Sequence, residues 1–400
     1  MTTSFGPSGA PSLAGPAGGS QNFGYPMDYD RVVRKEASLG FIRQLAPPED
    51  HLWPRLIPMM DVPTDDFVFD YIEPDITSGL ASARAQDAES ELVQHDFWAG
   101  GQGRASIMDW ANKDTYSATD VVNYRDAQAI AQAMNASGAQ LPTTVAQNVN
   151  HLPTKIARHA RQRVQRFHNR FEEIFTKSLV NSEYTYNDGR MGFTIPWGRP
   201  TNQTNQEPES GTYAADTHDP VNDFLAVGQY MFDTHGITID RVIGSRKALS
   251  SFYKSSKFRL LTGFAPGSGV GESDMNYLVK GWGPRAAMEF VAEQTGITPI
   301  VHDAVYRTRN ADGTVTATRY LPEDTLIFLP ATNSISEIDS TGLGFGRVCT
   351  APHIEGNMQS GFYEWEQMQR DPWQLTVGTG IKAFPVLPYM HFTYTLKLTL

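Results

Sequence analysis

The sequence predicts an α+β protein in which compact lobes carry long extended appendages. Three observations predict this class: a very long amphipathic helix at 153–181, an alternation of helices and strands over 220–335, and β-rich sequence from residue 336 onward. The 400 residues exceed a single typical domain. A hydrophobic content of 40% is sufficient for a sizeable core, while 34 Gly and 25 Pro indicate many turns and long connections.

Composition and residue spacing argue against most kinds of catalytic or membrane-bound protein. The chain has a formal net charge of −11, and its single cysteine, Cys349, excludes an intrachain disulfide framework and a multi-thiolate metal site. Its ten histidines lack metal-ligand spacing, and no apolar run approaches the roughly 18 residues that a transmembrane helix needs. His302 and Asp303 are predicted to be surface residues of a strand. We therefore expect no enzyme activity, no cofactor and no membrane partner.

The N-terminal part of the chain shows no core of its own. Residues 1–24 consist mainly of Gly, Pro, Ser and Ala, which predicts a disordered tail. Residues 25–65 contain apolar anchors such as Trp53 and Leu56, but prolines interrupt every periodic pattern. We therefore predict an extended arm that lies on another surface.

A long two-stranded excursion is predicted to follow the arm. Residues 64–74 and 91–99 have the β-branched and aromatic content of strands, and a glycine-rich turn is predicted at 100–103. The chain then returns through a further strand-like stretch that ends near residue 119. An isolated two-stranded hairpin is marginally stable in water, so this excursion needs another protein surface on which to rest.

A helix at 124–137 precedes the long helix at 153–181, which opens with Pro153 at an early helical position. Its apolar residues recur at intervals of three and four and form one narrow stripe. They are Ile156, Ala160, Val164, Phe167, Phe171, Ile174, Phe175 and Leu179. At 1.5 Å per residue this helix is about 40 Å long, which exceeds what a compact lobe ordinarily buries.

The same helix carries a concentration of positive charge that runs against the acidic average. The basic residues are Lys155, Arg158, Arg161, Arg163, Arg166 and Arg170, and no Asp or Glu occurs at 151–171. A run of charge on a helix is most often a solvated face. Here, however, the helix forgoes the i, i+4 ion pairs that stabilise exposed helices. An anion nearby would explain this, either an acidic surface of a neighbouring chain or nucleic-acid phosphate.

Residues 220–335 are predicted to form a small α/β lobe, because helices and strands alternate there. Its first helix is ended by Gly236, Ser245 caps the second, and Gly296 closes the third. The last stretch of the chain, 389–400, alternates polar and apolar residues. It is predicted to be a half-buried strand with its apolar side on the long helix.

Three stretches of the chain carry a resemblance to a known family. They are FTIPWGRP at 193–200, THDPVNDFLAVGQYMFDTHGITIDRVIGSRKALSSF at 217–252 and TGITPIVHDAVYRTRNADGTVTATRYLPEDTLIFLPA at 295–331. In these stretches and in the order of its elements, the chain resembles the major capsid proteins of tailed double-stranded-DNA phages. These proteins have the Hong Kong 97-like fold, and the likeness is to the lambda-type coat protein E group among them. The resemblance covers about residues 64–400.

The resemblance implies a division of the chain into the parts of that fold. These are a disordered tail at 1–24, an N-terminal arm at 25–65, an extended β-hairpin (E-loop) at 66–123, a peripheral (P) domain at 124–219 that contains the spine helix 153–181, an axial (A) domain at 220–335, and C-terminal strands of the P domain at 336–400. Arm and E-loop are then expected to bury apolar side chains against neighbouring subunits. The residues expected there are Trp53, Leu56, Phe97, Trp98 and Trp110.

The function that the resemblance implies is structural. Such a protein self-assembles as hexamers and pentamers into the icosahedral head shell that encloses the double-stranded DNA of a tailed phage. It is located in the virion after assembly in the host cytoplasm. Expected partners are further copies of itself, portal, scaffolding and decoration proteins, and packaged DNA bound without sequence readout. The six basic residues of the helix would lie on the lumenal face or pair with acidic groups of the next subunit.

Two other interpretations stay open at this point. The same fold would serve an encapsulin-type nanocompartment, whose particles would hold enzyme cargo and no DNA. A soluble α/β enzyme or nucleic-acid-binding protein would instead be a small oligomer. Size-exclusion chromatography would separate that third interpretation from both shells.

Overall fold

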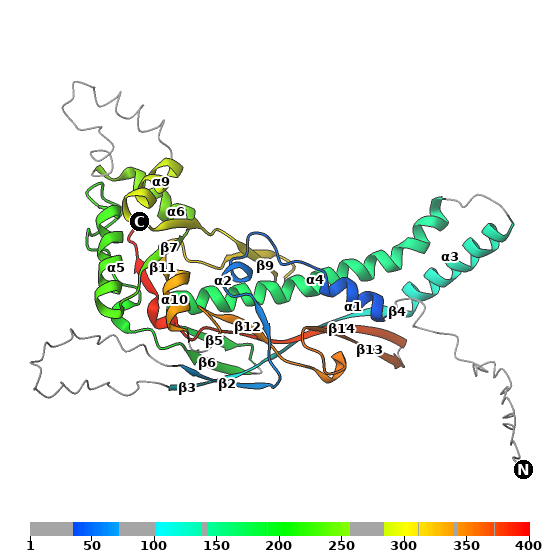
Figure 1. Ribbon diagram of the computed structural model, residues 1–400. Helices are drawn as coiled ribbons and strands as arrows, with labels where there is room; N and C mark the ends of the chain where they lie inside the picture. The colour runs from blue at the N-terminus through cyan, green and yellow to red at the C-terminus, as the bar shows by residue number, and fades with distance from the viewer. Residues whose placement is uncertain are drawn as a thin grey trace, which may run out of the picture.

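The structure is a computed structural model that describes residues 35–71, 101–137, 143–189, 191–256, 284–310, 312–339, 342–371 and 373–400. Figure 1 shows an elongated body built along one helix, with a lobe standing across one end of it. The predicted tail at 1–24 and the first part of the predicted arm lie outside the described residues.

Helix α4, Thr143–Asn181, runs through the body as its longest element (Figure 1). The apolar stripe predicted for it is confirmed, because the eight predicted residues from Ile156 to Leu179 are each at most 4% exposed. The helix begins before the predicted start at 153, so Pro153 lies inside it. Helix α3, Ala118–Ala136, packs beside the N-terminal part of α4 and also begins earlier than predicted. Its start is explained by Ser117, whose Oγ accepts a hydrogen bond from the Asp120 backbone N–H.

The apolar side of α4 lies on a five-stranded sheet. Its strands are β1 (Met59–Asp61), β12 (Arg347–Thr350), β14 (Trp373–Val386) and β13 (Phe362–Arg370) in that order, with β4 (Asp109–Ser117) paired to the first part of β14. Strand β14 is long enough to pair with both β4 and β12 along one edge. Phe171 and Ile174 of the helix share one core with Ile381 and Phe384 of β14.

The lobe contains a second, separate core around a four-stranded sheet. The strand order is β15 (Tyr394–Lys397), β11 (Thr325–Pro330), β7 (Ile239–Gly244) and β8 (Thr298–Val301). Helices α5 (Pro220–His235), α6 (Arg246–Ser250) and α9 (Pro284–Thr295) cover it. The predicted helix ends are confirmed: Gly236 and Gly296 have φ of 66° and 73°, and Ser245 Oγ accepts a hydrogen bond from the Ala248 N–H.

The prediction for the end of the chain was wrong. Strand β15 does not pack on the long helix but pairs with β11 at the edge of the lobe's sheet. Two polar residues of this stretch, Thr393 and Thr395, are fully buried, whereas Lys397 and Thr399 are exposed as the alternation predicts. The Thr393 Oγ1 accepts from Arg199 Nη1 and donates to the Met390 carbonyl, and Thr395 Oγ1 accepts from the Asn205 N–H. Because the hydroxyls of Thr393 and Thr395 both have partners, these two polar residues can be buried although the alternation predicts that they are exposed.

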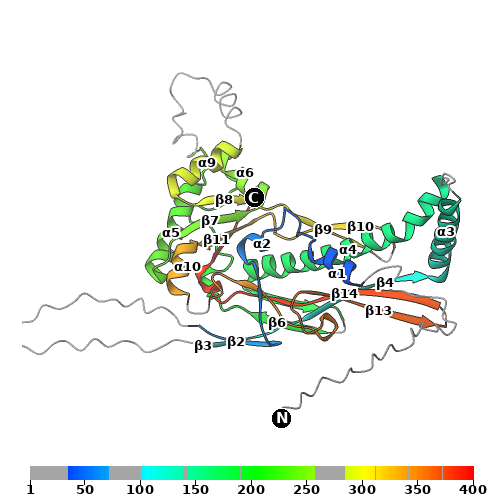
Figure 2. The ribbon, with the colours of Figure 1, turned by 45° about the vertical axis from the view of Figure 1, so that its right-hand side comes forward.

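The structure corrects part of the prediction for the two-stranded excursion after the arm. Strands β2 (Asp66–Tyr71) and β3 (Gly101–Ser106) pair antiparallel, so the glycine-rich stretch predicted as a turn is a strand. The later part of the predicted excursion is β4, which belongs to the main sheet. Residues 72–100, with the predicted strand at 91–99, lie outside the described residues. Figures 1 and 2 show the β2–β3 pair at the edge of the body, with its outer end directed away from α4.

Short elements complete the structure. They are α1 (Lys35–Arg43), α2 (Trp53–Leu56), β5 (Glu183–Asn187), β6 (Gly192–Pro196), η2 (Thr201–Gln203), η3 (Ser251–Lys254), β9 (Val305–Arg309), β10 (Val315–Arg319), α10 (Thr332–Ile338), η4 (Ile354–Gly356) and η5 (Met390–Phe392). The antiparallel pair β9–β10 extends from the lobe back over the body (Figure 2).

Candidate interaction surfaces along helix α4

The arm residues that the structure describes are held on the chain's own long helix. Trp53 is 2% exposed, stacks on His168 and meets the Phe171 ring edge-on. The backbone N–H groups of Leu52 and Trp53 both donate to Glu172 Oε2, each at 3.0 Å. The prediction that Trp53 contacts a neighbouring subunit was therefore wrong, because its own chain already covers the side chain.

Leu56 and Trp110, two further predicted contact residues, keep part of their surface free. Leu56 is half-buried at the edge of the core beneath α4. Trp110 is also half-buried, and its Nε1 donates to the Ala383 carbonyl at 2.8 Å. Phe97 and Trp98 lie outside the described residues.

A buried cluster of ionisable side chains joins the arm, the helix and the lobe. Glu172 is fully buried, and its Oε1 lies 2.9 Å from His302 Nε2. His51 of the arm meets the Tyr320 ring edge-on, close to the same carboxylate. The prediction that His302 is a surface residue was wrong, since it is 3% exposed. This contact could not be predicted from local sequence patterns, because Glu172 and His302 are more than a hundred residues apart.

Burial lowers the pKa values of two histidines at this site, His51 and His168. It lowers the pKa of His168 from its usual 6.5 to about 4, and the neighbouring His51 adds to the shift. Burial also lowers the pKa of His51, although Glu172 acts in the opposite direction. These histidines are therefore neutral at pH 7.

The six predicted basic residues do not form one face. Arg163 is 2% exposed and points into the sheet, where its Nη1 lies 2.5 Å from Asp114 Oδ2 and its Nε donates to Thr379 Oγ1. Glu364, also buried, lies 3.5 Å from the other guanidinium nitrogen. Arg163 is thus no part of a lumenal basic face. Its place was visible in the sequence, because position 163 falls between Ala160 and Phe167 of the apolar stripe at helical spacing.

The other basic residues differ in their surroundings. Lys155 Nζ lies 3.0 Å from Asp120 Oδ2, and Arg170 pairs with Glu173 on the same helix. Arg158, Arg161 and Arg166 are exposed. Arg161 also lies over the Phe41 ring, 5.9 Å from its centroid. Three exposed arginines on one side of α4 therefore remain of the predicted stripe.

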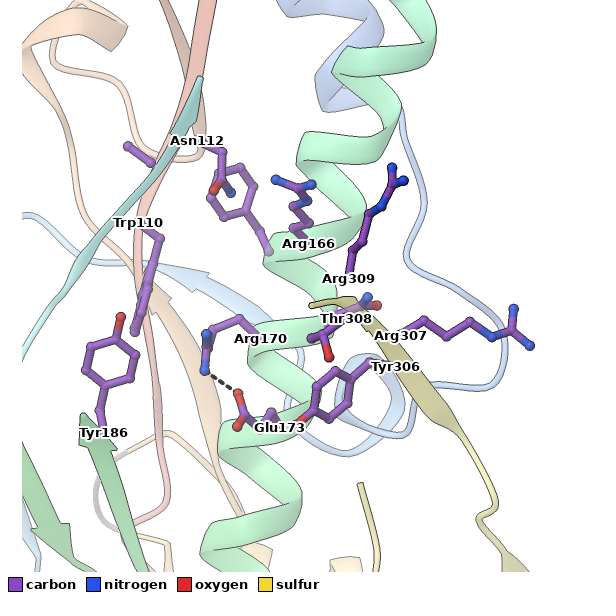
Figure 3. Close-up of a pocket in the computed structure, with 13 residues that line it drawn as sticks. Trp110, Asn112, Arg166, Arg170, Glu173, Tyr186, Tyr306, Arg307, Thr308 and Arg309 are labelled. Carbon is purple, nitrogen blue, oxygen red and sulfur yellow. Dashed lines mark hydrogen bonds and ion pairs between the residues drawn. The ribbon is translucent and has the colours of Figure 1, made fainter. Parts of the chain in front are cut away.

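Arg166 and Arg170 border a hollow beside the helix (Figure 3). It has a volume of about 460 Å³ and is lined by α4, β4, β5 and the β9 strand from the lobe. Trp110, Tyr186 and Tyr306 form aromatic walls, and the Arg170 guanidinium lies 5.7 and 5.3 Å from the Trp110 and Tyr186 ring centroids. Arg307 and Arg309 of β9 add further positive charge to the lining, against one acid, Glu173. Chemically, this hollow is suited to an anion that also presents apolar surface.

Other kinds of site find no support in the part of the chain that the structure describes. No group of three or more His, Cys, Asp or Glu side chains is placed to hold a metal ion among these residues. Within the same residues no helix is both long enough and apolar enough to cross a bilayer. Burial raises the pKa of Cys349 to about 12, so this thiol is not a reactive nucleophile.

Comparison with solved structures identifies the architecture. The crystal structure of a putative capsid protein of a prophage of E. coli CFT073 aligns over 91% of this chain and 98% of its own, with a TM-score of 0.53 and 14% sequence identity. The chain has a Hong Kong 97-like capsid fold. A phage-related protein from Bordetella bronchiseptica RB50 aligns over 91% and 96% of the two chains, with a TM-score of 0.51 and 12% identity. No protein-family profile matches this sequence, and no curated protein does.

The charged and aromatic residues that line the hollow lie beside the long helix α4 and not at the ends of the lobe's strands. Ligand sites of open α/β sheets form at the carboxyl ends of the strands. Here the charged and aromatic side chains gather instead where the body, the helix and the β9 strand meet (Figure 3). That position favours contacts with other macromolecules over the binding of a small substrate.

Proposed function

We propose that this chain is the major capsid protein of a tailed phage, with a structural and non-enzymatic role. It self-assembles as hexamers and pentamers into an icosahedral shell that encloses double-stranded DNA, and it resides in the virion. The observation that carries this proposal is the alignment of nearly the whole chain with nearly the whole of a putative prophage capsid protein.

The appendages of the structure support self-assembly. The β2–β3 pair leaves the body with 29 residues, 72–100, between its two strands. A two-stranded hairpin is marginally stable alone in water, so the β2–β3 pair gains stability when a neighbouring subunit covers it. Leu56, Phe97, Trp98 and Trp110 are the proposed contact residues. Large obligate interfaces of this kind exceed about 2,000 Å².

The proposed division of the chain follows the fold. Residues 25–65 are the arm, 66–123 the E-loop with the strand that anchors it, 124–219 and 336–400 the P domain, and 220–335 the A domain. Strand β15 pairs with β11 in the lobe's sheet, which supports counting Tyr394–Lys397 with the proposed A domain. Portal, scaffolding and decoration proteins are proposed further partners, and Arg158 and Arg161 are proposed to face packaged DNA.

Expression of the full chain, followed by sedimentation and cryo-electron microscopy, tests this proposal. We expect closed shells with five-fold and six-fold capsomers. A monomer or small oligomer at high concentration would contradict it. Small particles filled with an enzyme cargo and free of DNA would instead identify a nanocompartment.

A further inference from the structure

A strap of the arm lies on α4, next to the place where the β9–β10 hairpin leaves the lobe. The strap is residues 44–58, which join α1 to β1, and its four prolines prevent a long helix or strand. Its apolar anchors Leu52, Trp53 and Ile57 are at most 7% exposed. Because α1 packs on β13 and β1 pairs with β12, each end of the strap is fixed separately. Its middle can therefore leave α4 while both ends stay in place.

The β9–β10 hairpin depends on its base for its position. Apart from the half-buried Tyr306, the residues of its two strands are exposed, and a two-stranded hairpin alone is marginally stable in water. The base is buried instead: His302, between β8 and β9, is 3% exposed, and Tyr320, directly after β10, is 5% exposed. Their rings stack with centroids 6.4 Å apart. Figures 1 and 2 show α2 of the strap and the hairpin on the same side of α4.

Glu172 of α4 joins the strap to the base of the hairpin. Its carboxylate is fully buried. Oε2 accepts hydrogen bonds from the backbone N–H groups of Leu52 and Trp53, each at 3.0 Å. Oε1 lies 2.9 Å from His302 Nε2, and the His302 backbone N–H donates to the Gly244 carbonyl at the end of β7. One side chain of the long helix thus contacts the arm with one oxygen and the lobe with the other.

The two contacts of this carboxylate depend on each other. A buried carboxylate is stable only where donors and positive charge offset its loss of hydration. Departure of the strap removes two donors and admits water, which weakens the attraction between Glu172 and His302. Coupling between two sites is reciprocal, so displacement of His302 weakens the seat of the strap by the same factor. The edge-on contact of the His51 and Tyr320 rings, which also joins strap and base, acts in the same direction.

We propose that Glu172 is a latch that couples the strap to the β9–β10 hairpin. While the strap is seated on α4, the base of the hairpin is held against the helix. Release of the strap frees the hairpin, and displacement of the hairpin loosens the strap. Because β9 also lines the hollow beside α4, a molecule that captures the strap changes the wall of that hollow. The latch belongs to a single chain and goes beyond the proposed shell function, which would stand if the latch were disproved.

Hydrogen exchange in the full, unassembled chain tests the coupling from the side of the strap. Trp53→Ala removes the ring that stacks on His168 but keeps the backbone N–H groups that face Glu172. We expect amide exchange in residues 298–309 to rise at least about fivefold, the lower limit of typical coupling between two sites. Trp53→Phe makes a smaller change at the same position and gives the same test if Trp53→Ala does not fold.

The second variant tests the coupling from the side of the hairpin. His302→Phe keeps a ring to stack on Tyr320 but removes the nitrogen that faces Glu172. Exchange in the strap, residues 49–57, should rise at least about fivefold, since coupling is reciprocal. When Trp53→Ala is added, exchange in residues 298–309 should stay within about twofold of that in His302→Phe alone, because the latch is already open.

Phe41→Ala is the matched control. It removes an aromatic ring from the same arm, but from α1, at one fixed end of the strap. Exchange in residues 298–309 should then stay within about twofold of that in the unmodified chain, because Phe41 lies outside the strap and is no partner of Glu172.

Three results would overturn the inference. The first is a change of exchange that each variant confines to its own segment. The second is a rise of similar size in residues 298–309 with Phe41→Ala, or in β14 with Trp53→Ala, because either would show a general loss of stability. The third is a double variant in which the effects of Trp53→Ala and His302→Phe multiply, which would show that strap and hairpin open independently.

Discussion

Arg163 of α4 is buried between Asp114 and Glu364 of its own chain, whereas Arg166, less than one turn further along the helix, is exposed and has no acidic partner among the described residues. The two residues are three positions apart and look equivalent in the sequence. Arg163 contributes to the interior of one subunit. Arg166 contributes exposed charge that no acid in the described part of the chain pairs with. The comparison separates residues that hold the fold from residues that are available for assembly.

Replacement of Arg163 should have the largest effect on stability. Arg163→Met leaves Asp114 and Glu364 without their shared cation in a buried site, which costs about 3–5 kcal/mol of unfolding free energy. Urea unfolding of the unassembled chain measures this loss. Arg166→Met is the matched control and should change the unfolding free energy by less than about 0.5 kcal/mol. Equal stability of the two variants would remove the distinction between the buried and the exposed arginine.

Acid should weaken the attachment of the arm to the same helix. His168 has a pKa of about 4 in the folded protein and 6.5 when exposed, so the unfolded state binds protons first as pH falls. Stability is therefore fully present above pH 6.5 and is lost between pH 6.5 and 4, by about 3 kcal/mol in total. His51, Glu172 and His302 face the same site, and burial lowers the pKa of His51 as well.

A variant isolates this contribution from that of the other carboxyl groups. His168→Gln removes the titrating ring, so its unfolding free energy should fall less steeply between pH 6.5 and 4 than that of the unmodified chain. The difference between the two curves is the quantity to measure. Parallel curves would show that His168 is not neutral in the folded protein.

The contrast between Arg163 and Arg166 also shows what the sequence could predict. Spacing at three and four residues identified eight buried apolar residues of α4, though not Leu152 or Val180, and glycines identified two helix ends in the lobe. These signals are local. Arg163 satisfied the same spacing, but its charge led to the wrong prediction, because the acids that neutralise it come from strands far away in the chain.

Contacts between distant segments account for the other errors. Strand β15 joined the lobe because β11 offered it a pairing edge, and β3 formed a strand from a glycine-rich stretch because β2 pairs with it. In both cases the pairing partner outweighed the intrinsic preference of the residues. The hollow could not be predicted either, since its arginines lie on α4 and on β9, more than 130 residues apart.

Replacement of Lys155 should lower the unfolding free energy, but by less than replacement of Arg163. Its ammonium pairs with Asp120 at the junction of α3 and α4, and both side chains are partly exposed. Lys155→Met should therefore cost about 0.5–1 kcal/mol. The hydrogen bond from Lys155 lowers the pKa of Asp120, so this contribution is present at neutral pH and is lost in acid. If Lys155→Met lowered the unfolding free energy as much as Arg163→Met does, Lys155 would have to be counted as a buried ion-pair residue like Arg163.

Replacement of the exposed residues Arg158 and Arg161 should have the smallest effect on stability and should change mainly the binding of DNA. Arg158→Gln with Arg161→Gln removes two charges and, at Arg161, one contact with the Phe41 ring worth at most about 1 kcal/mol. If both residues bind DNA phosphate, the slope of log affinity against log salt concentration should become less negative by about 2. Titration of a labelled duplex with the unassembled chain at several salt concentrations measures that slope.

The control variant Arg246→Gln with Arg285→Gln, which removes two charges from the lobe, should leave the slope unchanged. If the α4 variant keeps the full slope, these arginines do not contact DNA, and their charge is available instead for a neighbouring subunit.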